Sequence, residues 1–112
     1  MNKEIKVGDV VNPLEVGQRG FDPKELFGAL RGLQTVWCWG AHAWTIHKDQ
    51  FLRFKSEGFL FKGHVYITLG WDDTFTIIYT TLKGKVVDIQ EGIYVDVLVE
   101  TIDRKIERKW LR

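Results

Sequence analysis

The sequence has little cysteine and no long apolar run. Cys38 is the one cysteine in 112 residues, which excludes an internal disulfide framework and a zinc cluster built on cysteines. No apolar stretch approaches the roughly 20 residues that a membrane-spanning helix needs. Residues 1–6 are charged and are not followed by the apolar core of a signal peptide. We therefore expect a cytoplasmic protein that does not bind a membrane.

Net charge and catalytic motifs are equally scarce. Sixteen basic residues against fifteen acidic ones leave a formal charge of +1. This balance excludes a large basic field for nucleic acid or anionic lipid, although it leaves room for a local basic patch. The sequence has no HExxH motif, no glycine-rich phosphate loop and no nucleophile elbow around Ser56, its only serine. We predict no cofactor and no metal site, and no catalytic residue is nominated.

What the sequence has in excess is aromatic residues, namely five Trp, three Tyr and seven Phe, or 13% of the chain. That share indicates a chain with enough apolar surface to bury a core, unlike a disordered tail. The length suits a single domain over residues 1–112. Glycine and proline interrupt residues 1–21, where we expect an extended arm that either packs on the domain or is partly mobile.

Hydrophobic periodicity predicts two helices on either side of a set of strands. Asp22 and Pro23 form a helix start, and leucines at helical spacing predict a helix over 23–33. Alternation over 35–89, broken by short turns, predicts four or five antiparallel strands. A four-residue apolar repeat predicts a helix over 94–109. We therefore predict an α+β fold, an antiparallel meander sheet with both helices on one face and the opposite face open to solvent.

Two neighbouring predicted strands carry basic residues at alternating positions. The turn between these strands would bring the two rows to one face of the sheet if their register agrees. Tryptophans that precede the strands could add an aromatic platform, and cations between flat rings suit single-stranded nucleic acid or another planar anion. The candidate ligand-binding residues are Trp37, Trp39, Arg53, Lys55, Lys62, His64 and Tyr66.

A simpler interpretation places the tryptophans in the core. Trp37 and Trp39 share one parity and Trp44 has the other, so the sequence leaves open which of them face the basic rows. We favour the core, because tryptophan is highly buried on average and long basic side chains can cover its edges. The small net charge also argues against strong binding to a nucleic-acid backbone.

The histidines and turn aspartates offer a second hypothesis, a small metal-dependent hydrolase. His42 and His47 are five residues apart, so an unbroken strand would place them on opposite faces. A zinc site would need a bulge there and a carboxylate. Ordinary surface or core histidines are the default, and adjacent aspartates in a turn commonly accept local backbone hydrogen bonds. The residues of this alternative are His42, His47 and His64, with Asp49, Asp72 or Asp73.

The stretch Phe51–Leu69, followed by the helical stretch Tyr94–Glu107, resembles small uncharacterised bacterial proteins of prophages and other mobile elements. The resemblance covers the C-terminal half of the chain and implies a bacterial or phage setting, but no activity and no site residue. The element order is also similar to that of double-stranded-RNA-binding domains, yet Glu91, Asp96 and Glu100 stand where that family has basic residues. We therefore predict a non-enzymatic binding or interaction module whose partner is another protein or a second copy, with single-stranded nucleic acid as a further alternative.

Overall fold

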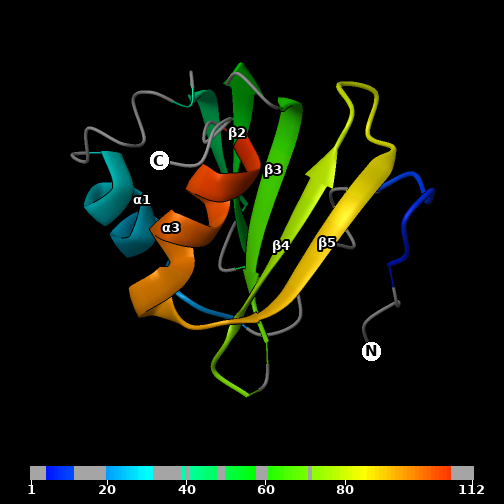
Figure 1. Cartoon of the computed structure of the whole chain (residues 1–112). Coiled ribbons are helices and arrows are strands. Elements are labelled where there is room, and N and C mark those ends of the chain that lie inside the picture. Colours follow the sequence, from blue (N-terminus) through cyan, green and yellow to red (C-terminus); the bar gives the residue numbers. More distant parts are fainter. Residues whose placement is uncertain are drawn as a thin grey trace.

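The computed structural model describes residues 5–11, 20–31, 39, 41–47, 50–57, 61–70 and 72–106. All structural statements below concern these residues. The elements in chain order are α1 (Pro23–Arg31), β1 (His42–His47), β2 (Phe51–Glu57), β3 (Lys62–Leu69), β4 (Phe75–Thr80), β5 (Val86–Ile93) and α3 (Val95–Ile106) (Figure 1).

The five strands form one sheet in the order β1-β2-β3-β4-β5, and each is antiparallel to its neighbours. Both helices lie on one face of this sheet (Figure 1). The predicted α+β meander with two helices on one face is confirmed. Short turns join β3 to β4 and β4 to β5, as the turn residues of the sequence indicate.

The core between the sheet and the helices uses the apolar positions that the sequence patterns select. α1 contributes Leu30, and α3 contributes a stripe whose members recur every four residues. From the strands come the alternating residues that share one face of a pleated sheet. The buried members of this core are Leu30, Trp39, Leu52, Phe54, Val65, Ile67, Phe75, Ile77, Tyr79, Leu98, Ile102 and Ile106.

The opposite face of the sheet is not simply open to solvent, and that expectation is wrong. A second buried cluster lies there, and the N-terminal arm supplies part of it. Val11 N–H donates to the carbonyl of Gly84 (2.8 Å), and Val86 N–H donates to the carbonyl of Asp9 (2.7 Å). Residues 5–11 therefore pack on the sheet beside β5, and we call this face the arm face. Its buried cluster consists of Val11, Phe51, Tyr66, Ile78 and Val86.

Element boundaries differ from the prediction mainly at β5. Alternation predicts a strand that ends at Ile89, but β5 continues to Ile93. A register shift opposite Phe75 and Ile77 accommodates Gly92, whose φ of 70° is in the left-handed region. The bulge lets the strand continue through a stretch that reads as a break. The predicted helix ends at residues 33 and 109, and the start of the predicted meander at 35–38, lie outside the described residues.

The start of α1 follows the predicted capping. The Oδ1 atom of Asp22 accepts hydrogen bonds from the backbone N–H groups of Lys24 (3.1 Å) and Glu25 (3.2 Å). Pro23 has no N–H group, so two of the three N–H groups that lack a helical partner at this helix start are thus satisfied. This cap fixes where α1 begins and so where Leu30 enters the core.

Gly63 of β3 lies close against the backbone of Thr80 in β4. A Cβ atom at this position would collide with the backbone carbonyl of Thr80, which cannot move without disturbing the sheet. We predict that Gly63→Ala lowers the free energy of unfolding by about 2 kcal/mol or more, as measured by urea denaturation. The matched control is Gly28→Ala on α1, where a Cβ meets nothing within 4 Å. That change should raise the free energy of unfolding by about 0.5–1 kcal/mol. An unchanged midpoint for Gly63→Ala would contradict the close approach.

Candidate functional site

The basic rows of β2 and β3 meet on the arm face. Arg53 pairs with Tyr66, and Lys55 pairs with His64. Residues directly opposite one another on antiparallel strands project from the same face, with their Cβ atoms about 5 Å apart. The juxtaposition that the sequence predicts is therefore present. We call these residues the basic strip: Arg53, Lys55, Lys62, His64 and Tyr66.

Arg53 is held in place by its neighbours on the flanking strands. Its Nη2 donates to Thr45 Oγ1 of β1 at 3.1 Å, and its Nη1 donates to the hydroxyl of Tyr66 of β3 at 3.5 Å. The guanidinium also lies over the Tyr66 ring, 5.7 Å from the ring centroid. Tyr66 itself is 2% exposed and packs edge-on against Phe51. Arg53 thus supplies a positioned positive charge, while Tyr66 offers no exposed ring for stacking.

His64 is partly buried, and two cations of the strip influence its pKa. Burial, followed by the charges of Arg53 and Lys55, lowers the pKa of His64 below its usual 6.5. Two buried nitrogen atoms of this region, His64 Nδ1 and Arg53 Nε, have no hydrogen-bond partner in the described structure. Buried polar atoms are normally paired, so these two mark a place that suits an additional polar group.

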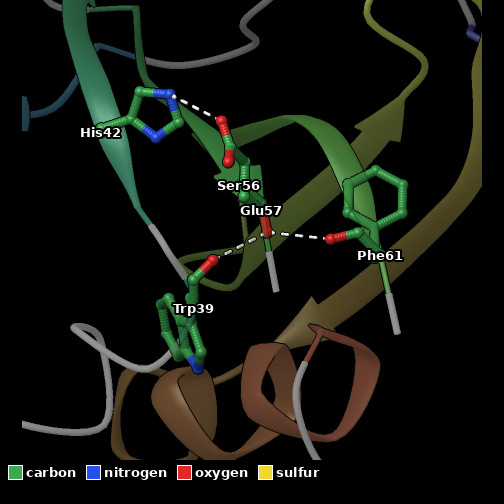
Figure 2. A network of polar contacts seen from close by, with 5 residues as sticks. All are labelled: Trp39, His42, Ser56, Glu57 and Phe61. Atoms are coloured by element: carbon green, nitrogen blue, oxygen red, sulfur yellow. Dashed lines mark hydrogen bonds and ion pairs between the residues drawn. The ribbon is translucent and has the colours of Figure 1, made fainter. Parts of the chain in front are cut away.

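One acid lies beside the lysines of the strip, because Glu57 pairs with Lys62 across β2 and β3. Lys55 is half-buried and Lys62 is exposed, and neither forms an ion pair with another described residue. Glu57 is the nearest acid along β2, and its Oε2 lies 3.4 Å from Nε2 of His42 on β1 (Figure 2). Since both of those side chains are about half exposed, solvent screens their attraction. The strip therefore carries more positive than negative charge.

Trp39 lies on the other face of the sheet, so its assignment to the ligand-binding residues is wrong. Its ring is fully buried and stacks on Phe54, with 5.7 Å between ring centroids, and its Nε1 donates to Asp103 of α3 at 3.1 Å. Trp44 is half-buried and contacts Phe54 and Phe27 of α1, so it also belongs to the helix side. Both rings therefore pack in the core, as the simpler interpretation of the sequence predicts. Trp37 lies outside the described residues.

A buried serine fixes the end of β2 beneath the strip. The hydroxyl of Ser56 lies 3.1 Å from the carbonyl oxygens of Trp39 and of Phe61 (Figure 2). The backbone N–H of Glu57 also donates to the carbonyl of Trp39. Ser56 and Glu57 are consecutive, so their side chains point to opposite faces. The serine therefore faces the helix side and leaves the glutamate on the arm face beside His42 (Figure 2).

The structure does not bring His64 together with Asp72 or Asp73. His64 lies near the start of β3, whereas Asp72 and Asp73 follow its end, about 15 Å or more away at the usual rise of a strand. Asp72 Oδ1 accepts hydrogen bonds from the backbone N–H and the hydroxyl of Thr74, which lower the pKa of Asp72. Asp72 therefore accepts local hydrogen bonds within its turn, as adjacent aspartates commonly do. Among the described residues, no group of three His, Cys, Asp or Glu side chains could hold a metal ion.

Two further hydrolase candidates lie beyond this description. The side chain of His47 and the whole of Asp49 are outside the described part of the chain. His42, in contrast, pairs with Lys55 and so lies on the arm face in line with His64. The two described histidines thus flank Lys55, and His42 also lies beside the carboxylate of Glu57.

β1 adds two residues to the edge of the strip that the sequence patterns do not predict. Thr45 pairs with Arg53 and His42 pairs with Lys55, although positions three apart in a regular strand face opposite sides. A register shift between them, with Ala43 at a φ of 53°, brings both to the arm face. Bulges with positive φ usually contain glycine, so the alanine supplies no signal in the sequence.

Comparison of the chain with protein-family models, with curated proteins and with solved structures finds no match in any of the three. Within the described residues, no helix has the length and apolar character needed to cross a membrane. The interpretation of the site therefore depends on the geometry and charge of its own residues.

Removal of the Ser56 hydroxyl tests the support beneath the strip. We predict that Ser56→Ala lowers the free energy of unfolding by about 1–3 kcal/mol, because a buried carbonyl loses its donor. Thr101→Ala is the control, since its hydroxyl donates to Val97 O on an exposed part of α3. The control should change the free energy by less than about 0.5 kcal/mol. Urea denaturation measures both variants. Equal losses would show that the Ser56 hydrogen bonds stabilise the fold no more than the exposed Thr101 hydrogen bond does.

The pKa of His64 gives a test of the positive potential. Because this pKa lies below 6.5 in the folded chain, the unfolded chain binds the proton more readily. The neutral imidazole of His64 therefore contributes fully to the free energy of unfolding above pH 6.5. This contribution is lost as the pH falls from 6.5 through the pKa of His64 in the folded chain. His64→Gln should remove this part of the pH dependence. An imidazole titration followed by NMR should give a pKa below 6.5 that rises with added salt; a pKa at or above 6.5 would be evidence against the positive potential.

Proposed function

We propose that the chain is a non-enzymatic binding module that holds an acidic segment of a partner protein on the basic strip. The observation that carries the proposal is the alignment of Arg53, Lys55 and His64 on one face without a described carboxylate paired to any of them. Carboxylates of a partner would satisfy these donors with charge-assisted hydrogen bonds. The same carboxylates would favour protonation of His64.

An acidic protein segment fits the strip better than single-stranded nucleic acid. Proteins that bind single strands combine basic grooves with exposed aromatic rings on which bases stack. Tyr66 is 2% exposed and Trp39 is fully buried, so neither ring is available to a base. A positioned set of cations, beside which the described structure shows no exposed ring, supports recognition of carboxylates.

No specific observation favours the metal-dependent hydrolase. Its described histidines lie on either side of Lys55, a cation that would repel a metal ion, and the one carboxylate beside them, that of Glu57, does not complete a group of three metal ligands among the described residues. The bacterial or mobile-element setting and the cytoplasmic location stay predictions from the sequence.

The proposal is tested by titration with a poly-glutamate peptide, followed by NMR or calorimetry at low salt. We predict that Lys55→Gln combined with Lys62→Gln weakens binding by about tenfold, because two cations of the strip are lost. The matched control is Lys24→Gln with Arg104→Gln, which removes the same charge from the two helices on the other face of the sheet. The control should weaken binding by no more than about twofold.

Four outcomes would contradict the proposal. One is the absence of binding at low salt, and another is an equal loss in both double variants. The third is tighter binding of an oligothymidylate than of the peptide, which would assign the strip to nucleic acid. Resonances of His64 and Arg53 should move on binding, so a response confined to other residues would place the peptide elsewhere.

A further inference from the structure

The exposed large apolar side chains of the described structure fall into two groups at opposite ends of β5. Their exposed fractions range from 40% to 73%. One group lies on the arm, on the hairpin between β4 and β5 and at the start of β5. The other lies where β5 passes into α3. Exposed apolar groups that gather in one place commonly mark interaction surfaces.

The first group is surrounded by lysines. The arm pairs with the hairpin through Val10, whose partner is Lys85, and Gly8 N–H donates to the carbonyl of Val86. Among the described residues of the arm and the hairpin, the one carboxylate is that of Asp9, which accepts a hydrogen bond from the backbone N–H of Lys6 at 2.9 Å. We call this surface the lysine patch: Val7, Val10, Leu82 and Val87, with Lys6, Lys83 and Lys85, all of them exposed.

The second group is accompanied by acidic residues. Glu91 is exposed at the bulge of β5, and Asp96 is exposed in the first turn of α3. The basic residues of α3, Arg104 and Lys105, belong to its last turn, more than 10 Å along the helix axis at the usual rise per residue. We call this surface the acidic patch: Tyr94, Val95 and Val97, with Glu91 and Asp96.

The two patches of one chain cannot meet each other. They are separated by β5, which runs from Val86 to Ile93 and spans about 25 Å at the usual rise of a strand. Figure 1 shows the arm and the β4–β5 hairpin at one end of the sheet and the start of α3 at the other. The complementary patch therefore has to come from a different molecule.

We propose that the lysine patch of one copy binds the acidic patch of a second copy, head to tail. Each patch presents apolar side chains together with the charge that the other lacks, which is the complementarity expected of two surfaces that bind each other. The contact joins different surfaces of the two copies and leaves one patch free at each end, so further copies can add. This association uses neither Lys55 nor His64 and is independent of the proposed function.

The test uses sedimentation velocity on four samples at several protein concentrations and at low salt. The wild-type chain should form species larger than a monomer as concentration rises. A lysine-patch variant, Lys83→Glu with Lys85→Glu, and an acidic-patch variant, Glu91→Lys with Asp96→Lys, should each associate about tenfold more weakly, because like charges then face each other. An equimolar mixture of the two variants should associate as the wild type does, since every contact again joins opposite charges.

Recovery in the mixture separates the proposal from simple damage to the fold, because two misfolded variants would not restore each other. Thermal unfolding of each variant supplies a second check. A wild-type chain that stays monomeric at every concentration overturns the proposal, as does a mixture that stays monomeric while the wild type associates. Co-sedimentation of the wild type with phosphatidylserine vesicles, without self-association, would assign the lysine patch to a lipid surface and also overturn it. The poly-glutamate titration of the Lys55 and Lys62 variant tests the proposed function alone, so the failure of one proposal can be distinguished from the failure of the other.

Discussion

The burial of Trp39 is the constraint on which the arrangement of the sheet, the helices and the basic strip depends. Its indole is tied to Asp103 of α3 and stacked on Phe54 of β2, while its carbonyl accepts hydrogen bonds from the end of β2. One residue thus connects three parts of the chain. By drawing Ser56 to the helix side, the same contacts leave Glu57 and Lys55 on the arm face. The strip is therefore a consequence of how this core closes.

Local patterns predict the parts of the fold that neighbouring residues decide. The alternation of Val65 and Ile67 identifies the core face of β3, and a short turn after β2 is enough to set Lys55 opposite His64. The burial of the arm face could not be predicted in this way. Thr76 and Thr80 read as solvent-facing positions but are buried, because threonine suits either side of a strand and the covering depends on distant segments.

The site was predictable in its charges but not in its aromatic residues. Whether Trp39 faces the strip or the core depends on Asp103, 64 residues further along the chain, and no local period reports on such a partner. The bulge at Ala43 could not be predicted from the sequence either. Among the described residues of the strip and its surroundings, the rings of Tyr66 and Trp39 are both buried. Charge is also distributed along the strands, with Lys83 and Lys85 at one end of β5 and Glu91 at the other.

The meander also implies an order of folding. Every strand pairs with a neighbour in sequence, so forming the sheet requires only the closure of short loops, which costs little conformational entropy. The contacts of Trp39 with Asp103 and of Val10 with Lys85 instead span most of the chain. Such distant contacts are slow to form unless the intervening chain is already compact. The sheet can thus serve as the template on which α3 and the arm dock last, one on each face.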